Sequence, residues 1–127
     1  MKFPLSHLTV FWVYFFAILV LIAIPVGNEH MANLNNIYLL RFRGDYILHA
    51  LMFLPWCFLL PTARLPIWWW LAAGIAFAAG TEGLQYLLPY RAFNINDMIA
   101  NALGVIMGFV LMIIWQHLRR ESRIIKQ

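Results

Sequence analysis

Apolar residues occupy four long stretches of the chain, and polar residues gather in the short segments between them. The first stretch, residues 8–26, carries no formal charge over 19 positions. About 20 apolar residues suffice for a helix to cross the roughly 30 Å hydrocarbon core of a bilayer. The pattern therefore predicts an all-α integral membrane bundle of four transmembrane helices, at about residues 8–26, 45–61, 67–88 and 97–115.

The first stretch also resembles a signal peptide, because Lys2 would supply the basic flank that such a peptide carries. Its apolar part is longer than the roughly 7 to 15 residues typical of a signal peptide, and no A-x-A-like cleavage site follows. We therefore interpret this stretch as the first membrane span.

Two local features modify the simple four-helix pattern. Met31, Leu34 and Tyr38 recur at helical spacing in the connector 27–44, which predicts a short interfacial helix between the first two spans, with Asn28 as its cap. Pro55 interrupts the second span, and its missing N–H predicts a kink there.

Composition supports a membrane protein and excludes several other classes. Hydrophobic residues make up 64% of the chain and charged residues only 11%, against about 25% in soluble domains. The whole chain, residues 1–127, is expected to form one domain. Its net charge of +4 comes from basic residues at the ends of apolar stretches, which indicates membrane topology and no nucleic-acid partner. A single cysteine, Cys57, allows no internal disulfide and no thiol-pair metal site.

Counting Lys and Arg near the span ends predicts the orientation. Four spans place both termini on the same side as the turn that contains Arg64. That side holds six basic residues and the other side three, so the positive-inside rule predicts cytoplasmic termini in a multi-pass protein. The six are Lys2, Arg64, Arg119, Arg120, Arg123 and Lys126, and the three are Arg41, Arg43 and Arg91.

This topology predicts that polar residues from three spans meet near the outward surface. The second span begins with two of them, the third span carries two near its end, and the fourth begins with two more. We call these six residues the polar cup: Asp45, His49, Glu82, Gln85, Asp97 and Asn101. Arg91 follows in the outward-facing connector after the third span.

The fourth span shows how the cup is expected to pack. At about 100° per residue, Asp97, Asn101, Gly104 and Gly108 share one face of the helix. The spacing of Gly104 and Gly108 lets two helix backbones approach closely inside a membrane.

Each polar residue also has a structural interpretation. Asp45 and Asp97 could cap their helices, the latter together with Asn94. Gln85 and Asn101 could hold helices together by hydrogen bonds, and His49 could be a core histidine. Glu82 is the hardest to explain structurally, because an acid within a membrane costs at least a few kcal/mol. Its structural alternative is an ion pair with Arg91 or His49.

The same residues resemble the VanZ-like family of small bacterial membrane proteins. The family pattern has an acid followed four positions later by His, then E-x-x-Q, a Pro and an Arg, and finally D-x-x-x-N-x-x-G-x-x-x-G. It is matched here by Asp45 and His49, Glu82 and Gln85, Pro89 and Arg91, and Asp97, Asn101, Gly104 and Gly108. Tyr46 departs from the pattern, in which a Lys often follows the acid.

The resemblance implies a multi-helix protein of the bacterial cell envelope, located in the cell (inner) membrane. The family is named for a member that lowers susceptibility to the glycopeptide antibiotic teicoplanin. Our first hypothesis is a non-enzymatic protein whose cup binds an amphipathic anionic ligand, such as a lipid headgroup, a lipid-linked cell-wall intermediate or a lipoglycopeptide. Arg91 would meet the anionic group, while Glu82, Gln85 and Asn101 would fix its orientation.

The alternative hypothesis is a membrane-embedded enzyme that acts on a lipid-linked or phosphorylated envelope substrate. Glu82 or Asp97 would serve as the base, His49 as acid or base, and Arg91 would stabilise developing negative charge. The order and spacing of the acids and the histidine match no metal signature, and no cofactor is expected. The expected partners are membrane lipids, and the sequence is compatible with a homo-oligomer.

Overall fold

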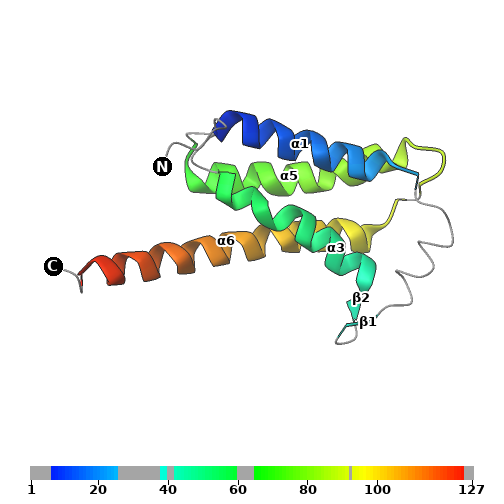
Figure 1. Cartoon of the computed structure of the whole chain (residues 1–127). Helices are drawn as coiled ribbons and strands as arrows, with labels where there is room; N and C mark the ends of the chain where they lie inside the picture. The colour runs from blue at the N-terminus through cyan, green and yellow to red at the C-terminus, as the bar shows by residue number, and fades with distance from the viewer. Residues whose placement is uncertain (1–6, 26–37, 40–41, 60–64, 92, 125–127) are drawn as a thin grey trace.

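Four helical segments, each running opposite to the one before it, make up most of the structure (Figure 1). This computed structural model describes residues 7–25, 38–39, 42–59, 65–91 and 93–124. The segments are α1 (His7–Ala23), α3 (Gly44–Phe53) with its continuation η1 (Leu54–Leu59), α5 (Ile67–Tyr86) and α6 (Ile95–Ile124). The four predicted helices are confirmed, and the last one continues well beyond its predicted end at residue 115.

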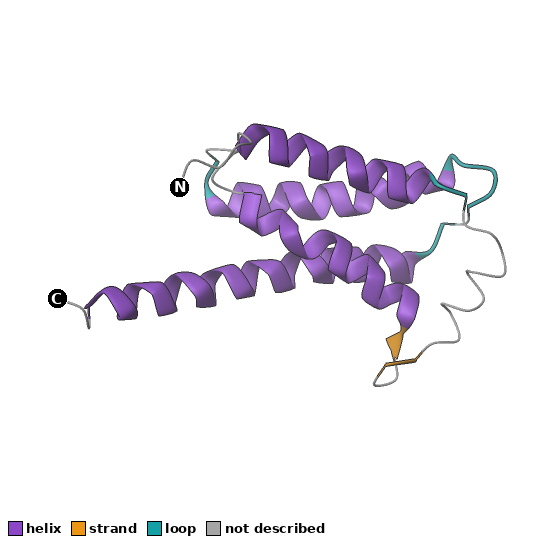
Figure 2. Ribbon diagram, in the orientation of Figure 1, coloured by secondary structure: helices purple, strands orange, loops and turns teal. Residues whose placement is uncertain are grey.

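A β-hairpin with strands of two residues each precedes α3, where the sequence predicted a helix. Strands β1 (Tyr38–Leu39) and β2 (Phe42–Arg43) pair antiparallel, with Tyr38 opposite Arg43 (Figure 2). The predicted interfacial helix is therefore wrong at Tyr38, because antiparallel pairing satisfies the backbone where the chain reverses before α3. Its other positions, Asn28, Met31 and Leu34, lie outside the described residues.

The second segment changes its helical type next to Pro55. The α-helix ends at Phe53, and residues Leu54–Leu59 continue as a 3₁₀ helix. Proline lacks the N–H that an α-helix needs at this position, so the chain tightens into a form with different hydrogen bonding. The predicted irregularity at Pro55 thus takes the form of a 3₁₀ segment.

Helix α6 lies against α3, η1 and α5, and two glycines make this contact tight. A Cβ atom at Gly104 would overlap the carbonyl oxygen of Ala50, and one at Gly108 would overlap that of Leu54. No side chain larger than hydrogen fits at either place without moving the backbones apart. The pair therefore fixes α3 and η1 directly on α6.

An aromatic cluster fills the bundle at the end away from the β-hairpin. Trp56 of η1 stacks on Trp70 of α5, with ring centroids 4.4 Å apart and planes 11° from parallel. Each indole nitrogen donates to the backbone oxygen of the other residue, both at 3.0 Å. Phe11 and Phe15 of α1 pack on this cluster through Trp56, Trp70 and Phe77.

The outer surface of the bundle is apolar. Large hydrophobic side chains stay exposed on every helical segment, and the exposed fraction reaches 72% at Tyr86 of α5. Among the described helices, only Ile95–Ser122 of α6 is long and apolar enough to cross a membrane by itself, while Leu8–Ala23 and Gly44–Leu59 are shorter apolar helices.

Candidate functional site

The predicted site lies at the end of the bundle where α1 and α5 finish and α3 and α6 begin (Figure 1). His49 is in the second turn of α3, Glu82 and Gln85 are in the last two turns of α5, and Asp97 and Asn101 are in the first two turns of α6. Alternating helix directions therefore bring these side chains to one end of the molecule, whereas the remaining interior is apolar.

A chain of hydrogen bonds links three helices at this end. Nδ1 of His49 lies 2.9 Å from Oδ1 of Asn101. Nδ2 of Asn101 donates to Oγ1 of Thr81 over a long 3.5 Å, and the Thr81 hydroxyl donates to the Ala78 carbonyl at 2.7 Å. Because the Thr81 hydroxyl is used as a donor, its oxygen accepts from the Asn101 amide nitrogen, which leaves the Asn101 oxygen facing His49. Nδ1 of His49 is therefore the donor, and Nε2 is left to act as an acceptor in the neutral ring.

The other ring nitrogen of His49 points to α6. Nε2 lies 3.7 Å from Oδ2 of Asp97, so protonation of His49 would create an ion pair between α3 and the first turn of α6. Both side chains are mostly shielded from solvent. Asn101 thus bonds one nitrogen of the imidazole, and the Asp97 carboxylate lies near the other.

Glu82 is the most unusual residue of the site. Its side chain is completely buried, with 0% exposed. Neither carboxylate oxygen has a hydrogen bond of ordinary geometry to any described residue, although the backbone amide of Asn94 approaches the group. Asp97, His49 and Arg91 are close enough to act on its charge. A buried carboxylate normally has its oxygens bonded, so Glu82 has unused acceptor capacity.

Arg91 and its neighbour Tyr90 attach the end of α1 to this site. A terminal nitrogen of the Arg91 guanidinium donates to the Ile24 carbonyl at 2.9 Å, and the Tyr90 hydroxyl donates to the Ala23 carbonyl at 2.6 Å. These donors satisfy carbonyls that a helix leaves unpaired at its C-terminus. Nε of Arg91 is buried and has no partner among the described residues. Arg91 is therefore partly used for structure.

One of the capping interpretations, that of Asn94, describes what the structure shows. Oδ1 of Asp45 accepts the backbone N–H of Tyr46 at 3.0 Å in the first turn of α3. Oδ1 of Asn94 accepts the N–H of Asn96 at 3.0 Å, so Asn94 caps α6. Asp97 follows in that first turn with its carboxylate toward His49. Asp45 is thus bound locally at the start of its helix, one turn before His49.

Thr81 and Tyr90 belong to the site although sequence reasoning did not select them. Thr81 is buried and lies four positions before Gln85, so helical spacing places both on one face of α5. That spacing is a signal in the sequence that could have identified Thr81. Tyr90 lies in a short turn without periodicity, and its bond to α1 depends on tertiary packing.

The family model described as VanZ/LLP1 matches residues 9–116 of the chain, which include every residue of the site. The chain belongs to the VanZ/LLP1 family. This match confirms the resemblance that the polar residues suggested. No curated protein and no solved structure matches the chain.

The VanZ/LLP1 site offers hydrogen-bond acceptors, a held imidazole and one guanidinium donor. Within the described residues, no group of three or more His, Cys, Asp or Glu side chains is arranged to hold a metal ion. The chemistry that these residues can perform is polar recognition or proton transfer.

Proposed function

We propose that this VanZ/LLP1 protein spans the bacterial cell membrane four times, with both termini in the cytoplasm, and binds the headgroup of an amphipathic, lipid-linked ligand in its outward polar cup. Through that ligand it would modulate the cell envelope and its response to glycopeptide antibiotics. The headgroup would carry an anionic group for Arg91 and hydroxyl or ammonium donors for Glu82.

The dimensions of the helices support four crossings. Helix α1 is about 26 Å long and α5 about 30 Å, at 1.5 Å per residue. The α3–η1 segment reaches about 27 Å in only 16 residues, because a 3₁₀ helix rises about 2.0 Å per residue. These lengths are close to the roughly 30 Å of a hydrocarbon core. The 3₁₀ segment thus gives a short stretch of chain the length of a span.

The distribution of polar residues supports the same environment. Exposed Val13, Phe16 and Trp68 cover the outside of the bundle, whereas Glu82 and Asn101 are buried within it. Soluble proteins rarely expose such extensive apolar surface. Acyl chains of a bilayer would cover it without cost.

The buried Glu82 carboxylate, whose oxygens accept no hydrogen bond of ordinary geometry from the described residues, carries the binding proposal. A carboxylate removed from water is costly unless donors meet its oxygens. Nε of Arg91 is also buried without a partner among the described residues, and Arg91 is close enough to act on the charge of Glu82. A headgroup with both donors and an anionic group would satisfy the acid and the guanidinium together.

Native mass spectrometry of the protein in nanodiscs of its host membrane would test this proposal. Glu82→Gln keeps the size of the side chain and removes the charge. The amount of lipid-linked molecule retained by the protein should therefore fall about tenfold, which corresponds to about 1.4 kcal/mol of binding free energy. The matched control is Glu121→Gln, because Glu121 is exposed and pairs with His117 on α6. Equal retention of the same molecules by both variants would contradict the proposal.

The held imidazole favours one alternative, a membrane-embedded enzyme acting on a lipid-linked or phosphorylated envelope substrate. His49 fixed by Asn101 with Nε2 free to accept a proton is arranged as a general base, with Glu82 or Asp97 as the second proton-transfer group. Purified protein incubated with total host lipid would then change the phosphate-containing lipids over time. Loss of that turnover in His49→Gln and Glu82→Gln would support catalysis, and an unchanged lipid profile with the wild-type protein would exclude it.

A further inference from the structure

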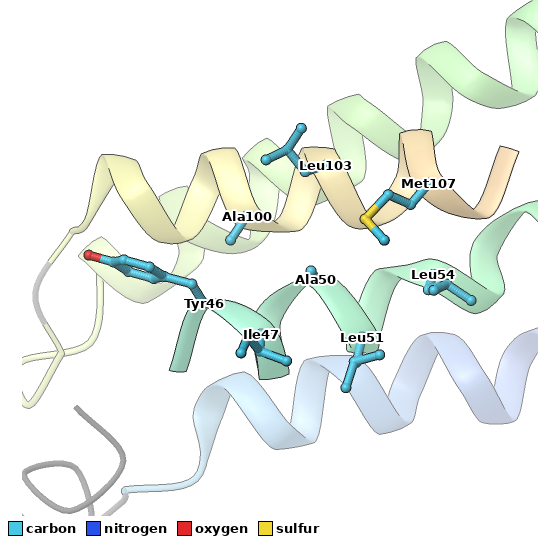
Figure 3. A pocket seen from close by; sticks show the side chains of 8 residues that line it. All are labelled: Tyr46, Ile47, Ala50, Leu51, Leu54, Ala100, Leu103 and Met107. Atoms are coloured by element: carbon cyan, nitrogen blue, oxygen red, sulfur yellow. The ribbon is translucent and has the colours of Figure 1, made fainter. Parts of the chain in front are cut away.

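We propose that an apolar groove between α3 and α6 holds one acyl chain of the ligand whose headgroup enters the polar cup. The groove has a volume of about 350 Å³ and lies beside the cup, with different lining residues. It is lined by Tyr46, Ala50 and Leu51 of α3 and by Ala100, Leu103 and Met107 of α6, among others (Figure 3). This inference rests on the proposed function and names the part of the protein that would recognise the tail.

The glycine contact explains why the groove exists. Gly104 and Gly108 hold α6 so close to α3 and η1 that the space beside the contact has a narrow floor. Ala50 and Ala100 face each other across that floor, and longer side chains stand along both rims (Figure 3). Small residues between rims of leucine and methionine leave a long, thin hollow.

The length and direction of the groove suit a lipid tail. From Tyr46 to Leu54 it follows the helices for about 12 Å, close to the roughly 15 Å depth of one leaflet. Tyr46 lies at the end nearest the start of α3, and its hydroxyl points away from the apolar side chains (Figure 3). That end is also where the cup begins, because His49 is less than one turn from Tyr46. A tail lying in the groove would therefore have its headgroup beside the cup.

The rims favour an acyl chain over a helix from a second copy of the protein. Helices associate closely in membranes through small residues. Here Leu51, Leu103 and Met107 stand about half exposed on the two rims and would hold a second helix away from the alanine floor. A flexible chain fits between them and touches floor and rims together, so it gains more dispersion contacts than it has among other lipids.

A photoactivatable lysophosphatidylethanolamine with a diazirine in its acyl chain provides the test. Its phosphate and ammonium groups match the headgroup chemistry proposed above. In phosphatidylcholine nanodiscs we expect cross-links on peptides that contain Leu51, Leu103 and Met107. Ala100→Phe fills the floor and should lower this labelling about tenfold, which corresponds to about 1.4 kcal/mol of lost packing. Ile106→Phe is the matched control, because Ile106 is exposed on α6 and does not line the groove.

Further variants separate the possible outcomes. Met107→Phe narrows the groove from its exposed rim and replaces Ala100→Phe if that variant does not fold. A fatty alcohol with the same diazirine should label the groove in wild type and in Glu82→Gln alike, so a failed headgroup proposal would leave this labelling intact. Equal labelling of the wild-type and filled variants would overturn the groove proposal. An intermolecular disulfide formed by Leu103→Cys in place of lipid labelling would identify a second copy as the occupant and would also overturn it.

Discussion

The two ends of the bundle treat buried polar groups in opposite ways. At the aromatic end, the indole nitrogens of Trp56 and Trp70 each find a backbone oxygen at 3.0 Å, and the rings stack on each other. At the cup end, the Glu82 oxygens and Nε of Arg91 are buried without such partners in the described part of the chain. The aromatic end therefore uses its polar groups within the fold, and the cup end leaves hydrogen-bonding capacity unused among the described residues, which is the capacity that the proposed ligand would use.

The largest effect on stability is expected at the glycine contact between α3 and α6. Gly104→Ala places a methyl group against the Ala50 backbone, which forces α3 and α6 apart, and we expect a loss of about 3 kcal/mol in the free energy of unfolding. Gly83→Ala is the matched control, because a Cβ there meets nothing within 4 Å. That control should be neutral or gain up to about 1 kcal/mol from helix propensity. Melting temperatures in detergent would measure both, and equal melting of the two variants would contradict the tight contact.

The next effect concerns the aromatic end alone. Trp70→Phe keeps an aromatic ring but removes the donor to the Trp56 carbonyl, so we expect a loss of about 1 to 3 kcal/mol in stability with ligand retention unchanged. Trp69→Phe serves as the control, because Trp69 points outward with 70% of its surface exposed and should change stability by less than about 0.5 kcal/mol. A Trp70→Phe protein that melts normally but loses its ligand would reverse our assignment of the two ends.

At the cup end, Glu82→Gln should raise stability and lower ligand retention, whereas Trp70→Phe lowers stability and leaves ligand retention unchanged. A neutral amide is less costly to bury than a carboxylate without partners, so the ligand-free protein should gain about 1 kcal/mol in stability while ligand retention falls. Melting in lipid-free detergent and mass spectrometry in nanodiscs measure the two quantities separately. A marked loss of stability would instead indicate that Glu82 holds the fold together.

The smallest effect is expected where α1 meets the cup. Tyr90→Phe removes the hydroxyl that donates to the Ala23 carbonyl and should cost about 0.5 to 1 kcal/mol. Because the change is local, hydrogen exchange at the Ile24 amide, which bonds to the Val20 carbonyl, should accelerate more than exchange near Trp70. Tyr86→Phe, an exposed position on α5, should leave that exchange rate unchanged.

Sequence periodicity predicted the helices well because lipid-like composition and helix length are local properties. The predicted starts at residues 8, 45, 67 and 97 lie within two positions of the observed ones. Grouping His49, Asp97 and Asn101 at one end followed from alternating helix directions. Their mutual distances could not be predicted, because they depend on how far Gly104 lets α6 approach α3.

Other features were beyond sequence reasoning because they arise from contacts between distant segments. The use of Arg91 and Tyr90 to bind the end of α1 joins residues 67 positions apart. The β-hairpin before α3 depends on chain reversal in a segment whose periodicity also suits a helix. The alanine-floored groove is formed only where two helices meet, so neither helix reveals it alone.

In the proposed membrane topology, the length of helix α6 would set the depth of the site. Along its 30 residues, Asp97 of the cup and Trp115 are separated by about 27 Å, nearly the thickness of a hydrocarbon core. Arg119 lies over the Trp115 ring, 4.5 Å from its centroid, an amphipathic pair of the kind that prefers the water boundary of a membrane. In the proposed membrane topology, with that pair at one boundary, the length of α6 between Trp115 and Asp97 would set how far the Asp97 carboxylate lies from the opposite boundary. Inserting a single residue between Asp97 and Trp115 would shift Asp97 along the helix axis by about 1.5 Å and rotate it around the axis by about 100° relative to Trp115.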